Sequence, residues 1–297
     1  MKILSMRPDT LKTKIFLDSG DPQETKELIK LLGFLDGQTT NPTLIAKNPQ
    51  AQERLAKGNK FSKEEVMSFY NDVVTEISLL IPNGSISIEV DANAQSDADK
   101  LFSQAEEMNT WIPNAHIKYP TTAAGLAAAE QSLKKGMRVN MTLVFSQEQA
   151  AAVYAATREA GTPTLPGFKN VFLSPFAGRL DDLGENGMDL IKNCVTMYQD
   201  TDHHVEVLAA SIRSYDHLLA SFAHGADIVT APLKIYKEWA EKGMPVPDKS
   251  FSYNPGLTAI PYAQLDLSKG WSSYNISHEL TDKGLQRFSE DWNTLVA

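Results

Sequence analysis

Short apolar runs rich in β-branched and aromatic residues alternate along the chain with amphipathic segments of helical period. The amphipathic segments carry helix start signals, such as Asp21 before Pro22 and the capping-box spacing of Ser62 and Glu65. The pattern predicts eight strands that are each followed by a helix. The predicted strands are residues 14–18, 35–40, 86–90, 115–119, 137–144, 170–174, 205–209 and 226–230.

Eight alternating strand and helix units imply parallel pairing through βαβ connections. This number of units in 297 residues is what a (β/α)8, or TIM, barrel needs. The rival is a doubly wound open sheet, but no Gly-x-Gly-x-x-Gly follows the first strand and no Walker-type loop is found. We therefore predict an α/β protein with a single domain over residues 1–297. The barrel spans about 14–245, and a C-terminal helical extension spans about 250–297.

Two stretches depart from the repeated pattern. Residues 48–60 are polar and are predicted to be less regular, and the tail contains a helix that begins near Thr281. The aromatic side chains of the tail indicate that it packs either on its own barrel or on another subunit, which leaves a homo-oligomer open. These side chains are Trp271, Phe288 and Trp292.

The composition limits the classes of molecule that this chain is expected to bind and the compartment in which it is expected to work. A net charge of −9 argues against broad binding of nucleic acids or anionic membranes, although a local pair of arginines can still bind phosphate. The single cysteine, Cys194, has no internal disulfide partner and is interpreted as a small buried hydrophobe. No secretory or transmembrane run is found, and residues 1–8 are too short and polar for a signal peptide. These features indicate a cytoplasmic protein.

Lys118 is an unusual residue for the strand in which it lies. Burying an ammonium group is expensive unless the group is paired or neutral. Near the C-terminal end of a barrel strand, its side chain points into the site at that end. A desolvated lysine can act as an amine nucleophile on carbonyl substrates. The alternative is a lysine on an edge strand in water.

Polar side chains gather at the C-terminal ends of the other predicted strands, where a barrel carries its active site. Singly, several have structural explanations. Asp18 can be a helix N-cap, Thr39 or Asn41 a turn residue before Pro42, and Glu89 an ion-pair partner of Lys118. Asn140 and Thr142 can simply satisfy polar groups of the barrel. Arg179 can be a surface partner of Asp181 or Asp182. Together they favour a catalytic site, whose members are Asp18, Thr39, Asn41, Glu89, Lys118, Asn140, Thr142, Ser174, Arg179, Ser211 and Arg213.

This set suits amine-based carbonyl chemistry. Lys118 can attack a ketone to form an iminium ion, while two carboxylates divide the proton transfers and two arginines clamp a phosphate. Nothing in the set requires a metal or another cofactor. The six histidines form no ligand-spaced cluster, and His116, which shares the parity of Lys118, is interpreted as core.

The sequence closely resembles the transaldolases. The most specific blocks are Thr39-Thr40-Asn41-Pro42 and the block Ser174-Pro175-Phe176 with Gly178-Arg179. The segments that carry the resemblance are 17–20, 36–45, 88–91, 117–118, 140–146, 174–179 and 209–213.

The resemblance implies a class I aldolase-type barrel of the pentose phosphate pathway that moves a dihydroxyacetone unit between phosphorylated sugars. It implies a Schiff base on Lys118, carbinolamine dehydration by Glu89 through a water with help from Thr142, and proton abstraction by Asp18. The implied donors and acceptors are sedoheptulose 7-phosphate or fructose 6-phosphate and glyceraldehyde 3-phosphate or erythrose 4-phosphate. The residues implied in substrate binding are Thr39, Asn41, Asn140, Ser174, Phe176, Arg179, Ser211 and Arg213.

Two other functions stay open. A related branch, the fructose-6-phosphate aldolases, releases free dihydroxyacetone; its members are shorter and tend to have Gln where this chain has Glu89 and Tyr where it has Phe176. Both positions favour the transferase. A barrel that only binds sugar phosphates is the third hypothesis, but a pure binder has no need of Glu89 and Lys118 together.

Overall fold

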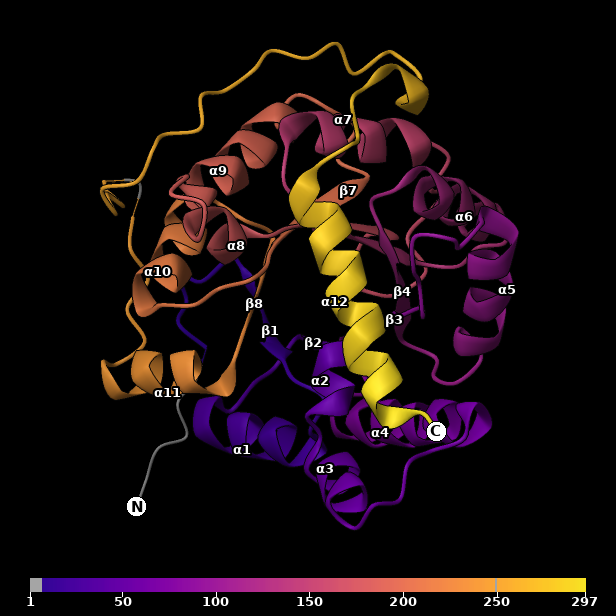
Figure 1. Cartoon of the computed structure of the whole chain (residues 1–297). Helices are drawn as coiled ribbons and strands as arrows, with labels where there is room; N and C mark the ends of the chain where they lie inside the picture. The colour runs from indigo at the N-terminus through magenta and orange to yellow at the C-terminus, as the bar shows by residue number, and fades with distance from the viewer. Residues whose placement is uncertain (1–6, 249) are drawn as a thin grey trace.

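Eight parallel strands close into a barrel with helices around it, in the computed structural model that describes residues 7–248 and 250–297 (Figure 1). Each strand pairs with the next along the chain, and the last pairs with the first, which excludes an open doubly wound sheet. The predicted barrel is thus confirmed. The strands are β1 (Lys14–Asp18), β2 (Gly37–Thr39), β3 (Ser85–Glu89), β4 (Ala115–Pro120), β5 (Val139–Val144), β6 (Val171–Pro175), β7 (Val205–Ala209) and β8 (Ile228–Ala231).

The helices begin largely where the capping signals predict. Asp21 accepts a hydrogen bond from Gln23 N before α1 (Pro22–Leu32), and Ser62 and Glu65 form a complete capping box on α4 (Lys63–Leu80). The other helices are α2 (Pro42–Ala46), α3 (Pro49–Ala56), α5 (Ala98–Met108), α6 (Ala123–Lys134), α7 (Gln147–Ala156), α8 (Ala177–Asp181), α9 (Gly187–Tyr198), α10 (Tyr215–Ala223), α11 (Leu233–Glu241) and α12 (Glu279–Leu295), with a short 3-10 turn η1 (Trp271–Ser273).

The prediction for residues 48–60 is wrong in part, because α3 lies within them. Asn48 accepts a hydrogen bond from Gln50 N, and Pro49 occupies the first helical turn. An asparagine cap followed by proline is a helix start, and the polar composition of this segment hid it. The prediction that residues 1–8 form no signal peptide falls largely on residues 1–6, which lie outside the part of the chain that the structure describes.

The barrel interior is filled by side chains of the strands, and His116 is one of them. Its ring stacks on Phe172 with centroids 3.9 Å apart, and it hydrogen-bonds the Ser85 hydroxyl at 2.7 Å. Burial lowers the pKa of His116 to about 3, so the ring is neutral. The core interpretation of His116 is confirmed. So is that of Cys194, which is buried in α9.

The tail packs on its own barrel. An irregular segment leads around the outside to α12, which crosses the end of the barrel where the strands finish (Figure 1). Thr281 Oγ1 donates a hydrogen bond to Leu143 O at 2.9 Å, and Phe61 N donates to Leu295 O at 2.8 Å. These contacts fasten both ends of α12 across the mouth of the barrel.

Among residues 7–248 and 250–297, no helix combines the length and the apolar character needed to span a membrane.

Candidate active site

The C-terminal strand ends enclose a cavity of about 220 Å³ beneath α12. All but two of the predicted site residues line it, and the two exceptions are Glu89 and Asn140. The predicted residues in the wall are Asp18, Thr39, Asn41, Lys118, Thr142, Ser174, Phe176, Arg179, Ser211 and Arg213. The wall of this cavity therefore contains residues of several strands that are distant from one another in sequence.

Lys118 and Glu89 form a buried ion pair at the inner end of the cavity. They occupy paired positions on β4 and β3, and their side chains are only 4% and 3% exposed. Lys118 Nζ lies 2.9 Å from Glu89 Oε2 and donates a hydrogen bond to Thr40 O at 3.0 Å. The alternative of an edge-strand lysine in water is thus wrong, while the proposed ion pair with Glu89 is confirmed.

The environment of Glu89 favours its protonated form more than water does. Burial is the main cause of its raised pKa, and the positive charges of Lys118 and Arg179 oppose that rise. Glu89 Oε2 lies 2.9 Å from Lys118 Nζ and, apart from this ion pair, has no hydrogen-bond partner among the described protein groups. The carboxyl group of Glu89 can therefore hold or release a proton beside Lys118 Nζ.

Thr142 Oγ1 is the other buried side-chain oxygen without a hydrogen-bond partner in the described part of the chain. Thr142 lies on β5, beside β4, and lines the same cavity as Lys118. Buried hydroxyl groups are nearly always hydrogen-bonded. Thr142 Oγ1 is thus available to a water molecule or a substrate hydroxyl in the cavity, and Glu89 lies beside the same lysine.

Asp18 ends β1, lines the same cavity and is partly exposed. Thr39 Oγ1 donates a hydrogen bond to Asp18 Oδ1 at 2.8 Å and lies 2.6 Å from Thr230 Oγ1, from which it can accept. Burial raises the pKa of Asp18, and the charge of Lys118 partly opposes this. The alternative of Asp18 as a helix cap is wrong, because Asp21 caps α1.

The amide and hydroxyl groups are linked to one another. Ser174 Oγ donates to Asn140 Oδ1 at 2.7 Å, and Asn140 Nδ2 donates to Ser87 Oγ at 3.0 Å. Asn41 Oδ1 accepts from Leu44 N at 2.9 Å and so caps α2, which confirms its turn role, and Asn41 also lines the cavity. The bonds from Ser174 through Asn140 to Ser87 fix the orientation of these polar groups.

Positive charges gather at the outer part of the cavity. Arg179 on α8 lies over the rings of Phe176 and Phe288, at 5.2 and 5.4 Å from their centroids. The alternative in which Arg179 pairs with Asp181 or Asp182 is wrong, because Asp182 pairs with Arg213 and Asp181 lies 2.7 Å from His217. Burial, together with the nearby charge of Arg287, lowers the pKa of Arg179.

Two local backbone features bring these cations together. A Cβ at Gly178 would lie 2.5 Å from Arg213 Nε, so only glycine allows α8 to approach Arg213 this closely. Ser211 has a φ of 57°, a left-handed conformation that turns the chain between β7 and Arg213.

Sequence reasoning missed seven residues of the wall, namely Thr43, Leu44 and Ala210 and four further residues. Thr230 at the end of β8 had a visible signal, because it is polar and ends a strand. Lys47 ends α2, and the other two lie on α12, whose position no local pattern indicates. The four are Lys47, Thr230, Arg287 and Phe288.

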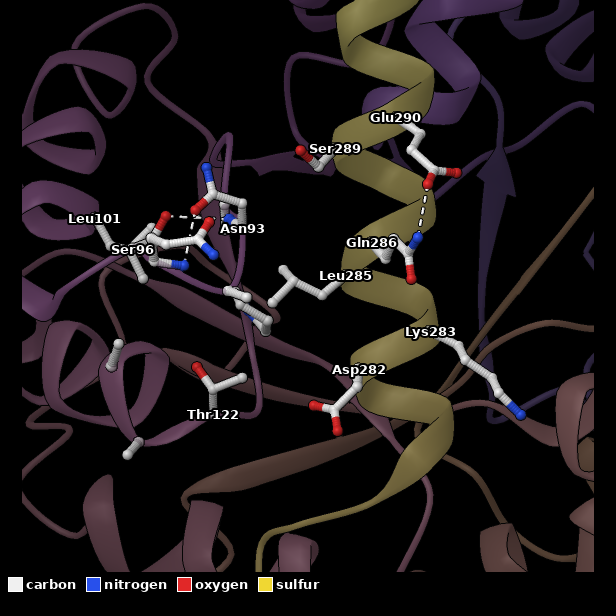
Figure 2. A pocket seen from close by; sticks show the side chains of 16 residues that line it. Asn93, Ser96, Leu101, Thr122, Asp282, Lys283, Leu285, Gln286, Ser289 and Glu290 are labelled. Atoms are coloured by element: carbon white, nitrogen blue, oxygen red, sulfur yellow. Dashed lines mark hydrogen bonds between the residues drawn. The ribbon is translucent and has the colours of Figure 1, made fainter.

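A larger cavity of about 670 Å³ lies beside α12, next to the loop that follows β3 (Figure 2). Its polar side chains largely bond to one another or to nearby backbone. Gln286 donates to Glu290 at 2.7 Å, and Ser96 Oγ accepts from Asn93 N at 3.0 Å. Lys283 points away from the groove in this view. The smaller cavity, with its buried lysine and cations, is therefore the candidate site.

The geometry suits carbonyl chemistry on an anionic, hydroxylated molecule. It combines a buried amine with two carboxyl groups whose pKa values are raised. A cationic group at the mouth is formed by Lys47, Arg179, Arg213 and Arg287. Within the described ranges, no group of three or more His, Cys, Asp or Glu side chains could hold a metal ion.

Comparisons with known proteins find relatives over nearly the whole chain. The profile of the family described as "Transaldolase/Fructose-6-phosphate aldolase" matches residues 15–297. A "Probable transaldolase" of Dehalococcoides mccartyi is 33% identical over 282 residues, which cover 95% of this chain and 99% of the relative. A "Probable transaldolase" of Herpetosiphon aurantiacus is 33% identical over 281 residues, which cover 94% of each chain.

Proposed function

The chain belongs to the transaldolase and fructose-6-phosphate aldolase family, and from this premise we propose that it is a transaldolase. It moves a dihydroxyacetone unit from sedoheptulose 7-phosphate or fructose 6-phosphate to glyceraldehyde 3-phosphate or erythrose 4-phosphate, as a step of the pentose phosphate pathway. A cytoplasmic location, expected from the sequence, is part of this proposal.

The observation that carries the proposal is the buried Lys118–Glu89 pair beside the open Thr142 hydroxyl. Lys118 Nζ, once neutral, attacks the ketone carbon of the donor to form a carbinolamine. Glu89, whose pKa burial raises, moves protons through a water molecule held with Thr142. The carbinolamine hydroxyl then leaves as water, and the iminium ion remains on Lys118.

Asp18 is the base for carbon–carbon cleavage in this proposal. It takes the proton from the C4 hydroxyl, the C3–C4 bond breaks, and the electron pair moves toward the iminium nitrogen to give an enamine. The aldose phosphate leaves, and the enamine attacks the aldehyde of the acceptor by the reverse steps. The raised pKa of Asp18 supports this role, because a base works best when its pKa approaches the operating pH.

The remaining residues bind the sugar. Ser174, Asn140 and Asn41 hold hydroxyls of the three-carbon unit, with Thr39 supporting Asp18. Arg179 and Arg213, with Ser211 between them in the cavity wall, clamp the phosphate. The position of this cationic group at the mouth supports a donor whose phosphate lies outward from the reacting carbons.

The alternative is a fructose-6-phosphate aldolase that releases free dihydroxyacetone. Glu89 and Phe176 favour transfer, as the sequence comparison of the two branches indicated. Phe176 packs edge-on against Phe145, with centroids 5.7 Å apart, so this part of the wall is apolar. An apolar wall gives the enamine no additional proton donor there.

A borohydride trap tests the chemistry. Fructose 6-phosphate and borohydride should place a reduced three-carbon adduct on Lys118, identified by peptide mapping, and Lys118→Ala should lose both adduct and turnover. Lys14, which pairs with Glu206 away from this cavity, is the internal control. An unmodified Lys118 would contradict the mechanism.

A second assay separates the two activities. With sedoheptulose 7-phosphate alone, a transaldolase releases about one equivalent of erythrose 4-phosphate per enzyme, and it turns over only when glyceraldehyde 3-phosphate is added. Continuous release of dihydroxyacetone without an acceptor would identify the aldolase instead.

A further inference from the structure

Tyr70 is a buried residue that reaches the reacting pair from outside the cavity. It lies on α4, its side chain is 1% exposed, and it is absent from the cavity wall. Its hydroxyl lies between β2 and β3, 2.6 Å from Thr40 Oγ1 and 3.0 Å from Glu89 N. A helix outside the barrel thus joins the two strand ends that carry the site.

The hydrogen bonds of the Tyr70 hydroxyl have a defined direction. Glu89 N can only donate, so the hydroxyl oxygen accepts from it. Thr40 Oγ1 donates to Ser87 O at 2.8 Å, which leaves Thr40 Oγ1 to accept the proton of Tyr70. The only proton of the hydroxyl is therefore donated to Thr40 Oγ1 and is not available to a molecule in the cavity.

These bonds fix the two peptide segments that hold the amine. Thr40 O accepts the hydrogen bond of Lys118 Nζ at 3.0 Å, and the carboxylate of Glu89 lies 2.9 Å from the same nitrogen. The Tyr70 ring is held in turn by Trp111 and Trp292, whose centroids lie 5.8 and 5.9 Å away. Trp292 belongs to α12, so the helix over the mouth braces the same tyrosine.

We propose that Tyr70 is a positioning residue for the Schiff-base chemistry, because its hydroxyl sets the spacing of Lys118 and Glu89. This inference rests on the proposed function, since it concerns the rate at which Lys118 forms and dehydrates the carbinolamine. Tyr70 touches neither the substrate cavity nor the cationic group at its mouth, so its contribution is to the chemical step and not to sugar binding.

Tyr70→Phe keeps the ring between the two tryptophans and removes only the hydroxyl. We expect kcat to fall about 10- to 100-fold, because small misplacements of reacting groups have effects of that size. The KM for fructose 6-phosphate should change less than about threefold, since the phosphate clamp lies elsewhere. The single-turnover rate of borohydride trapping on Lys118 should fall as much as kcat.

Tyr198→Phe is the matched control. Tyr198 is a buried helical tyrosine whose hydroxyl donates to Ala150 O at 2.7 Å, between α9 and α7 and away from the cavity. The Tyr198→Phe variant loses a hydrogen bond similar to that lost in Tyr70→Phe, so the thermal stability of both variants should fall by a similar amount. In Tyr198→Phe, however, kcat and the trapping rate should stay at the wild-type level. A purely structural role of Tyr70 would make the two variants alike.

Thr40→Val provides a second route if Tyr70→Phe fails to fold. It removes the acceptor of the tyrosine proton but keeps the Thr40 carbonyl, and it should lower kcat and trapping rate together. Thr40→Ser, which keeps the hydroxyl, should restore kcat and the trapping rate. Because the two changes break the same hydrogen bond, the Tyr70→Phe/Thr40→Val double variant should be no slower than the slower single variant.

The outcomes separate the two proposals. A wild-type protein that forms no adduct on Lys118 refutes the proposed function. A wild-type protein that forms the adduct, with wild-type kcat and trapping rates in Tyr70→Phe, refutes the positioning role alone. If only Thr40→Val folds, wild-type rates in that variant refute it equally.

Discussion

Gly284 on α12 offers a direct test of how the C-terminal helix shapes the site. A Cβ at this position would lie 2.4 Å from Arg179 Nη1 and 2.6 Å from Leu143 Cδ2, where about 3.4 Å is an ordinary contact. In Gly284→Ala the guanidinium must therefore move by about 1 Å. Because Arg179 Nη1 and Leu143 Cδ2 are both ends of side chains, we expect these two side chains to move and α12 to stay.

The expected loss is in phosphate binding and not in stability. A hydrogen bond to a charged group contributes about 1.5–3 kcal/mol, so losing one lowers kcat/KM for a phosphorylated donor about 10- to 100-fold. Alanine in place of glycine within a helix gains about 1 kcal/mol, which offsets much of the crowding. The melting temperature should therefore change by only a few degrees.

The assay compares two donors with the same unphosphorylated acceptor, glyceraldehyde. Gly284→Ala should lower kcat/KM for fructose 6-phosphate and leave that for fructose nearly unchanged. Lys283→Ala, on the exposed side of the same helix, is the control and should affect neither. An equal loss with both donors, or no loss with either, would show that Arg179 does not bind the phosphate.

Two further predictions concern charges of the cavity. Asp18→Asn should lower kcat at least about 100-fold, the scale of general-base catalysis. Because the pKa of Asp18 is raised in the folded protein, its stabilising contribution is present below the pKa of the unfolded chain and lost as pH rises. The melting temperature of Asp18→Asn relative to wild type should thus increase between pH 4 and pH 8, and a constant difference would contradict this. Arg287→Ala should raise the KM for fructose 6-phosphate about two- to fivefold with little change in kcat, because this side chain is largely exposed.

The features that sequence predicted well are those with a local cause. The strands follow from runs of apolar residues, and the starts of α1 and α4 follow from side chains that cap them within three residues. The meeting of Glu89 with Lys118 follows from parallel pairing, which places the ends of β3 and β4 side by side.

What sequence could not predict depends on contacts between distant segments. Arg287 and Phe288 enter the cavity because α12 returns across the barrel, and nothing within α12 indicates this destination. The same holds for Asp182, whose choice of Arg213 instead of its near neighbour Arg179 is decided by the fold. Tyr70 gave no signal either, since a tyrosine on an amphipathic helix is usually only core.

The cations at the mouth also affect how substrates arrive. The chain carries a net charge of −9, so most of its surface repels a phosphorylated sugar at a distance. Lys47, Arg179, Arg213 and Arg287 concentrate positive potential at one opening. Such an arrangement guides diffusing anions toward that opening, and its reach shrinks as salt is added, because the screening length falls to about 8 Å at physiological ionic strength. The rate of encounter is thus governed by the same side chains that hold the phosphate after it has bound.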